Sequence, residues 1–288
     1  METDSEPVTP LTRPLAVSVV SYNPCLPEIQ TTLESLADAV EFARARGALE
    51  TAELLIVDNG PGTGWKVALQ KLLNDLERKE QFISTRLLSG HGNVGYGAGH
   101  NLAINQSSAD FNLVLNPDVV LDRDAILKAM HFMYASPEVG LITPFVANSD
   151  GSPQFLCKRY PTVLDLVLRG FAPQGIQRMF RKRLESYEMR DVCGNNHPVL
   201  DVPIVSGCFM LFRRNLWEKV GGFSKKYFMY FEDFDLSLRF AEVSRLAYVP
   251  SVRIRHFGGN AAHKGKRHIL MFIRSALTFF YVHGWKLW

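Results

Sequence analysis

Short apolar runs alternate with longer segments of helical periodicity along the first half of the chain. Apolar runs that are short and bounded by polar residues predict buried strands, whereas apolar residues recurring every three or four positions predict helices. This alternation predicts βαβ units around a mostly parallel sheet, and therefore an α/β fold. The expected strands are 15–20, 53–57, 82–88, 111–115 and 139–143, and the expected helices are 27–46, 65–79, 99–105 and 123–134.

The second half of the chain is less regular. Residues 148–161 are rich in turn formers, and the apolar stretch 201–213 is interrupted by a Ser-Gly-Cys sequence. Gly207, inside this interruption, predicts a bulge or a close approach of the backbone to a ligand. The other elements expected here are a short helix over 217–223, a strand over 246–249 and an apolar, aromatic helix over 268–288.

Composition and charge narrow the functional classes. The 288 residues are 47% hydrophobic and 21% charged, which is typical of a folded globular protein. A net charge of +3 is too mild to indicate nucleic-acid binding. The four cysteines have no zinc-binding spacing, so reduced thiols in a cytoplasm are expected. No apolar run reaches the roughly 18 residues of a spanning helix, and residues 1–14 predict a disordered leader without a signal peptide.

The sequence FNLVLNPD at 111–118 combines a buried strand with a possible ligand site. Pro117 ends the strand, so Asp118 is expected just beyond its carboxyl end, where open α/β sheets bind ligands. A carboxylate there suits a divalent cation that carries phosphate oxygens. A simple turn without any ligand is an equally good interpretation of this segment alone.

The glycine-rich segment 92–101 also has two interpretations. Glycines allow a close approach of the backbone to a ligand, and a helix that begins here offers free N–H groups to an anion. The spacing matches neither the dinucleotide fingerprint nor the P-loop. A tight structural turn is at least as common, and the missing fingerprint counts against a nicotinamide-dependent dehydrogenase.

Three acids stand close together among aromatic residues in the segment 227–239. Asp235 precedes Arg239 by four residues, a spacing that pairs them on one helix face. Asp233 is the better candidate for a general base. Helix capping explains one acid in a first turn well, but explains three, Glu232 included, less well.

Basic residues cluster in two places in the second half of the chain, and the apolar C-terminal helix follows them. His256, followed by the cations His263, Lys264, Lys266 and Arg267, suits a diphosphate. The basic segment 178–190 is either a solvated helix face or a patch for anionic lipid headgroups or an acceptor diphosphate. The C-terminal helix either packs on the domain or contacts a membrane interface.

Taken in order, these motifs resemble one family. They are VSVVSYN (17–23), VDN (57–59), GNVGYGAGHN (92–101), LNPD (115–118), SGCFMLFRR (206–214), YFEDFDLSLR (230–239) and His256. Over about 15–275 the chain resembles family 2 glycosyltransferases of the GT-A fold. More narrowly, it is similar to bacterial rhamnosyltransferases of O-antigen, lipopolysaccharide-core and cell-wall assembly.

The resemblance implies roles for individual residues. Asp233 would be the general base, and Asp118 and His256 would hold Mg²⁺ or Mn²⁺ on the diphosphate, although Asn116 stands where a DxD motif has its first acid. The nucleotide pocket would be lined by Ser21, Tyr22, Asn23, Asp58, Asn59, Gly95, Asn101 and Asn116. The donor sugar or the acceptor would be contacted by Gly207, Cys208, Glu232, Asp235 and Arg239, and the diphosphate by His263, Lys264 and Arg267.

The resemblance also implies a reaction and an organisation of the chain. The reaction would be inverting transfer of L-rhamnose from dTDP-β-L-rhamnose to a saccharide or lipid-linked saccharide, in the cytoplasm or at the inner face of its membrane. A UDP- or GDP-sugar transferase and a non-catalytic nucleotide-sugar-binding protein are the alternatives. The expected parts are a GT-A domain over 15–265, with a nucleotide-binding half (15–145) and an acceptor-binding and catalytic half (146–265), and a C-terminal amphipathic, aromatic helix over 266–288.

Overall fold

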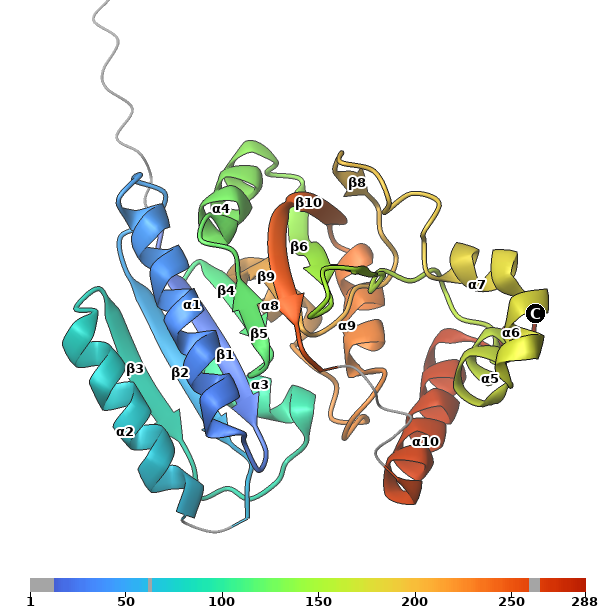
Figure 1. Ribbon diagram of the computed structural model, residues 1–288, viewed down its shortest axis with the longest axis horizontal. Helices are drawn as coiled ribbons and strands as arrows, with labels where there is room; N and C mark the ends of the chain where they lie inside the picture. Colours follow the sequence, from blue (N-terminus) through green and yellow to red (C-terminus); the bar gives the residue numbers. More distant parts are fainter. Residues whose placement is uncertain (1–12, 62–63, 259–264) are drawn as a thin grey trace, which may run out of the picture.

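A single mixed sheet with helices on both faces forms the centre of the computed structural model, which describes residues 13–61, 64–258 and 265–288 (Figure 1). The strand order is β3-β2-β1-β4-β9-β6-β10-β5, with β7 beside β6 and β8 beside β10. The strands are β1 (Leu15–Ser21), β2 (Ala52–Asp58), β3 (Ile83–Leu88), β4 (Phe111–Leu115), β5 (Val119–Leu121), β6 (Val139–Ala147), β7 (Pro153–Gln154), β8 (Val199–Leu200), β9 (Phe209–Arg213) and β10 (Arg245–His256). The helices are α1 (Leu26–Arg44), α2 (Gly64–Lys79), α3 (Tyr96–Ile104), α4 (Ala125–Ala135), α5 (Val163–Phe171), α6 (Gln174–Met179), α7 (Arg181–Tyr187), α8 (Arg214–Val220), α9 (Glu232–Ala241) and α10 (Lys266–His283).

Strands β1 to β4 form the parallel part of the sheet that the apolar runs predict. β1 pairs in parallel with both β2 and β4, and all seven of its residues are buried. α1, α2 and α4 pack their apolar sides on one face of the sheet. α3, α8 and α9 cover the other face, where Ile104, Trp217 and Phe240 belong to one cluster. The carboxyl ends of the parallel strands therefore meet at one edge.

The second half adds strands of both directions. β9 runs antiparallel to β4 and to β6, between which it lies. β10 continues well beyond the predicted end at Val249 because a register irregularity between Val249 and Arg253 lets the strand pass Pro250. Its last residue, His256, pairs with Val119 of β5. This longer strand carries His256 to the edge where Asp118 lies.

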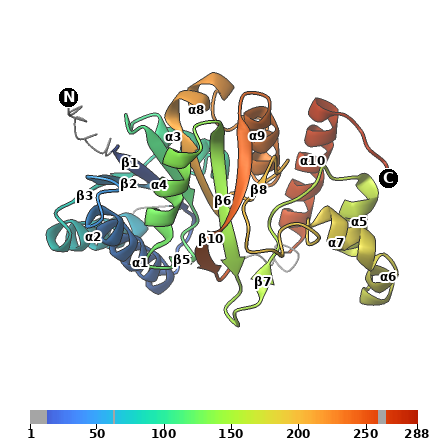
Figure 2. The ribbon, with the colours of Figure 1, turned by 90° about the horizontal axis from the view of Figure 1, so that it is seen from above.

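α10 packs against α9 through an aromatic cluster that includes Phe231, Phe279 and Phe280 (Figure 2). The helix ends at His283, earlier than predicted, because Gly284 adopts a φ of 103°. The C-terminal tail (284–288) then returns to α5, where the backbone N–H of Val163 donates to the carbonyl of Lys286. No helix in the described part of the chain is both long and apolar enough to cross a bilayer.

Candidate active site

The ends of β1 and β2 bring four of the predicted nucleotide-binding residues together. Ser21 and Asp58 are register partners, and both are buried. The N–H of Asn59 donates to the carbonyl of Ser21, and its side-chain amide donates to the carbonyl of Gly95 at 2.9 Å. The Ser21 hydroxyl is buried without a hydrogen-bond partner among the described residues. A buried hydroxyl of this kind is suited to a ligand group, since unsatisfied polar atoms cost free energy.

The turn after β1 presents two further predicted residues to solvent. Tyr22 is 53% exposed, and Asn23 adopts a φ of 49°, a left-handed conformation that asparagine tolerates well. Gly60, in the turn after β2, lies so close to the Asp58 side chain that an added Cβ would be 2.9 Å from its Oδ1. The two turns therefore form one wall beside the buried Asp58 carboxylate.

The glycines of segment 92–101 allow close packing inside the protein. An added Cβ would lie 2.4 Å from the carbonyl oxygen of Phe228 at Gly95, and 2.8 Å from the Phe223 Cβ at Gly97. At Gly99 it would lie 2.9 Å from Val20. The structural interpretation of this segment holds for these three glycines, because each brings α3 or its preceding turn against another element.

Tyr96, the first residue of α3, connects two of the predicted site segments. Its hydroxyl lies 2.8 Å from Oδ1 of Asn116 and 2.7 Å from the carbonyl oxygen of Gly207, and donates its single proton to one of them. The backbone N–H of Asn116 donates to the carbonyl of the buried Cys208 at 3.0 Å. Asn116, Gly207 and Cys208 therefore form one hydrogen-bonded layer over the end of β4.

Asp118 and His256 lie beside each other although 138 positions separate them in the sequence. Nε2 of His256 is 3.3 Å from Oδ1 of Asp118 and 3.2 Å from the Asn116 amide nitrogen. Gln154 orients the ring, because its amide nitrogen donates to the His256 carbonyl and leaves Oε1 facing Nδ1 at 3.2 Å. Nδ1 therefore carries a proton, and Nε2 points at the carboxylate.

This pair fits a divalent cation. A lone pair on Nε2 facing a carboxylate oxygen at 3.3 Å is favourable when a proton or a cation lies between them. In the described ranges no three His, Cys, Asp or Glu side chains converge on one point, so the protein would supply these two ligands. Mg²⁺ in such sites completes its coordination with substrate phosphates and water.

The turn that enters α9 holds two consecutive residues in the left-handed region. Tyr230 and Phe231 have φ values of 70° and 63°. Such conformations cost about 1–3 kcal/mol each for bulky residues and are concentrated at functional sites. Here they lead directly into Glu232 and Asp233, the first two residues of the helix.

Asp233 is aimed at the interruption before β9. Its Oδ2 accepts a hydrogen bond from the N–H of Gly207 at 3.0 Å, and its Oδ1 accepts from the N–H of Phe234. Burial nevertheless raises the pKa of Asp233. Burial, together with the neighbouring Asp233 charge, raises the pKa of Glu232 to about 8. Near neutral pH Glu232 is therefore protonated, whereas the two backbone N–H groups that donate to Asp233 favour the charged form of that carboxylate.

Asp235 lies on the side of α9 that faces α10, and its predicted pairing with Arg239 is confirmed. Both Nε and Nη2 of Arg239 donate to its Oδ2, at 2.9 and 2.6 Å. Nε2 of His283 lies 2.9 Å from its Oδ1. Arg239 also donates to the carbonyl of Val220. These two residues hold helices together, at a position separate from the Asp233–Gly207 contact.

The remaining predicted residues lie elsewhere. Asn101 clamps the loop after α8, because its amide donates to the Phe223 carbonyl and accepts from the Phe223 N–H. Arg267 is exposed in the first turn of α10. His263 and Lys264 lie outside the described residues.

The sequence did not single out Tyr96 or Gln154 as site residues. Tyr96 stands among four glycines and an alanine, where an aromatic side chain is the one signal that could have drawn attention to it. Gln154 reaches His256 from 102 positions away, and no local pattern marks it.

Comparison with known proteins identifies the family. The model of glycosyl transferase family 2 matches residues 16–221, which is most of the chain. The chain belongs to this family. A relative from Mycobacterium tuberculosis, named N-acetylglucosaminyl-diphospho-decaprenol L-rhamnosyltransferase, is 29% identical over 264 residues, covering 85% of this chain and 76% of its own length. Rhamnosyltransferase WbbL of Escherichia coli K12 is 26% identical over 190 residues, covering 62% of this chain and 66% of its own length.

Solved structures agree on the fold of this family 2 glycosyltransferase. GalNAc-T7 with UDP, GalNAc and Mn²⁺ superposes with a TM-score of 0.61 at 12% identity, over 88% of this chain and 45% of the longer one. TarS 1-349 of S. aureus with UDP gives a TM-score of 0.52 at 14% identity, over 92% of this chain and 65% of its own. The protein is therefore a glycosyltransferase with a GT-A-like mixed sheet.

Proposed function

We propose that this glycosyltransferase transfers L-rhamnose from dTDP-β-L-rhamnose, with inversion, to a hydroxyl of a saccharide or lipid-linked saccharide acceptor. The names of the mycobacterial and E. coli relatives support rhamnose as the sugar. The observation that supports the chemistry best is the half-buried Asp233 carboxylate, held by the Gly207 N–H in the layer that also contains Asn116.

The donor nucleotide binds at the ends of β1 and β2 in this proposal. Asp58, with the free hydroxyl of Ser21, receives the base and ribose, and the exposed ring of Tyr22 covers them. The diphosphate then extends along Asn116 toward Asp118 and His256. A divalent ion bound by this pair, Mg²⁺ or Mn²⁺, would neutralise charge on the departing diphosphate.

Asp233 acts as the general base. It removes the proton of the acceptor hydroxyl while that oxygen forms a bond to the anomeric carbon of the sugar. The bond from the anomeric carbon to the phosphate oxygen breaks, and the nucleoside diphosphate leaves with the electron pair. The raised pKa of Asp233 suits this role because it increases basicity over an ordinary aspartate. The protonated Glu232 beside it leaves a single negative charge near the reacting hydroxyl.

The acceptor is proposed to be lipid-linked and presented at the inner face of the cytoplasmic membrane, in bacterial cell-surface polysaccharide synthesis. The mycobacterial relative is named for a diphospho-decaprenol acceptor. Fourteen of the twenty-one large hydrophobic side chains exposed in the described part of the chain lie in α5, α6, α10 and the residues that flank them. Such a concentration fits a membrane interface better than water.

The basic segment 178–190 contributes less charge than its sequence indicates. Arg181 pairs with Glu185, Arg183 pairs with Asp165, and Arg190 pairs with Glu188. A solvated, internally neutralised helix pair therefore describes most of this segment. Arg178 and Lys182 are the cations in it that have no carboxylate within ion-pair distance in the described structure, and they remain available to anionic headgroups.

Calorimetric titration with dTDP, UDP and GDP, each with and without Mg²⁺, tests the donor assignment. Preference for dTDP that increases with Mg²⁺ is the expected result. Preference for UDP or GDP would retain the fold and the base but discard rhamnose. Absence of binding for all three would favour a non-catalytic role.

A further inference from the structure

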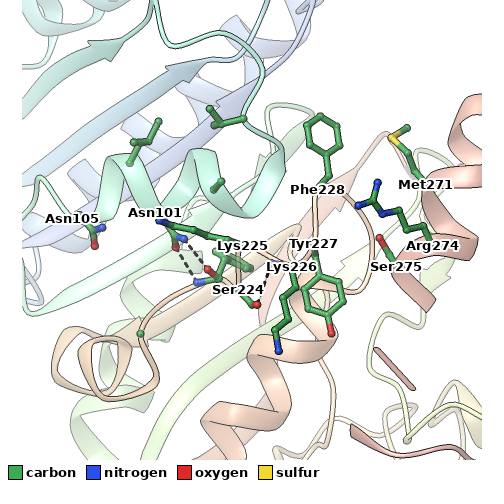
Figure 3. Close-up of a pocket in the computed structure, with 15 residues that line it drawn as sticks. Asn101, Asn105, Ser224, Lys225, Lys226, Tyr227, Phe228, Met271, Arg274 and Ser275 are labelled. Carbon is green, nitrogen blue, oxygen red and sulfur yellow. Dashed lines mark hydrogen bonds between the residues drawn. The ribbon is translucent and has the colours of Figure 1, made fainter. Parts of the chain in front are cut away.

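A cavity of about 980 Å³ lies between α3, the loop 221–228 and α10 (Figure 3). Asn101 of α3 and Asn105, which caps this helix, line it on one side, and Met271, Arg274 and Ser275 line it from α10. Figure 3 shows Arg274 extending from α10 toward Phe228, across the opening. This groove contains none of the strand-end residues that form the proposed donor site.

The groove is positively charged. Lys225, Lys226 and Arg274 line it, whereas none of the described residues that line it is acidic. Each of these three side chains is exposed, and none has a carboxylate within ion-pair distance in the described ranges. Three unpaired cations around one concavity attract a multivalent anion more strongly than isolated surface lysines do.

The walls of the groove are fixed to one another. The Ser275 hydroxyl donates to the carbonyl of Met229 at 2.7 Å, and the Tyr230 hydroxyl lies 2.8 Å from Nδ1 of His268. These contacts join α10 to the loop. The reciprocal hydrogen bonds between Asn101 and Phe223 join the same loop to α3. The groove is thus formed before any ligand binds, which lowers the entropic cost of binding.

Apolar side chains continue from the cations along α10. Leu270, Ile273 and Leu277 are 67%, 42% and 52% exposed on the turns around Arg274. Within the groove itself, Phe228 and Leu102 are also exposed. An anion that carries a hydrocarbon chain can contact both the three cations and these apolar side chains, whereas a free phosphate can contact only the cations.

Tyr96 connects the groove to the hydrogen-bonded layer formed by Asn116, Gly207 and Cys208. The N–H of Tyr96 donates to the carbonyl of Phe228, which lines the groove, while the Tyr96 hydroxyl contacts Gly207, which binds Asp233. Tyr96 therefore links the groove to the residues that hold Asp233, and the saccharide of an acceptor whose diphosphate lies in the groove would have to reach Asp233 around this residue.

We infer that the groove between α3 and α10 binds the diphosphate of a prenyl-diphosphate-linked acceptor, with Lys225, Lys226 and Arg274 as its counter-ions and the α10 stripe along its chain. This inference rests on the proposed function for the acceptor class. It adds a site for the diphosphate that is separate from the donor site.

Calorimetry with farnesyl diphosphate, at low salt, tests the inference. The triple variant Lys225→Gln, Lys226→Gln, Arg274→Gln should weaken this binding at least tenfold and leave dTDP binding unchanged. The matched control is Lys71→Gln with Lys219→Gln, two exposed lysines of α2 and α8 outside the groove lining, and it should change neither.

The possible outcomes separate this inference from the donor assignment. If wild type binds dTDP but not farnesyl diphosphate, the inference about the groove is wrong and the donor site is unaffected. The same holds if the triple variant binds farnesyl diphosphate as tightly as wild type does. Parallel loss of dTDP binding in the triple variant would move the three cations to the donor site. Phosphatidylglycerol nanodiscs are titrated in the same way. If wild type binds them as tightly as farnesyl diphosphate and the triple variant does not bind them, the groove would be a phospholipid site instead.

Discussion

Asp235 and His283 join α9, the helix that carries the proposed base, to α10, with 2.9 Å between the carboxylate Oδ1 and Nε2. The two helices lie side by side in Figure 2. The Asp235 carboxylate is buried and also binds Arg239. His283→Ala leaves the Arg239 contact in place and removes one partner of a buried charged group, which costs about 1–3 kcal/mol. We expect the free energy of unfolding to fall by that amount in urea titrations.

Thr278→Ala is the matched control, because the hydrogen bond of the Thr278 hydroxyl in the described part of the chain stays within α10, to the carbonyl of Arg274. An equal loss in the two variants would show that the contact between α9 and α10 adds nothing. Binding of dTDP should be unaffected in both, since neither residue lies at the strand ends.

Glu232 should make stability decrease with pH. Burial raises its pKa from 4.5 to about 8, so the folded protein keeps a proton that the unfolded chain has lost. The stabilising effect is complete below pH 4.5 and is lost as the pH rises through about 8. Glu232→Gln cannot lose a proton, and we expect it to gain stability relative to wild type between pH 5 and pH 8.5.

Urea unfolding at these two pH values measures this difference. Glu41→Gln, at an exposed position of α1, should follow wild type at both. Identical pH dependence in Glu232→Gln and wild type would contradict the assignment of the proton to Glu232.

The strand ends show what could be predicted from sequence. Short apolar runs locate Ser21, Asp58 and Asp118 after their strands, and parallel pairing brings such ends to one edge. The antiparallel insertion of β9 between β4 and β6 could not be predicted, because it depends on pairing across about a hundred residues. The same is true of Gln154, whose contact with His256 exists only after β7 and β10 have assembled.

The exposed apolar side chains of α6, α10 and the C-terminal tail should bind anionic membranes. Met179, Tyr281 and Trp288 are 82%, 85% and 80% exposed, so their replacement by serine removes apolar surface without opening the core. We expect the triple variant to lose co-sedimentation with phosphatidylglycerol vesicles. Truncation before Phe279 is a poorer test because Phe279 and Phe280 are buried.

Val67→Ser provides the control for this experiment. Val67 is 73% exposed on α2, which lies at the other end of the sheet from α10 (Figure 1). It should sediment with vesicles as wild type does. If the triple variant still sediments with vesicles as wild type does, these side chains do not bind the membrane and do not help to bring the protein to a lipid-linked acceptor.

The turnover of Asp233→Asn, measured with dTDP-β-L-rhamnose and a prenyl-diphosphate-linked saccharide, tests the central claim most directly. Asparagine keeps an oxygen for the Gly207 N–H and removes the basic group, so dTDP affinity should remain at the wild-type value. We predict that turnover falls by roughly 10²-fold or more, the scale of a lost general base. Turnover close to that of wild type would contradict the assignment of Asp233 as the base.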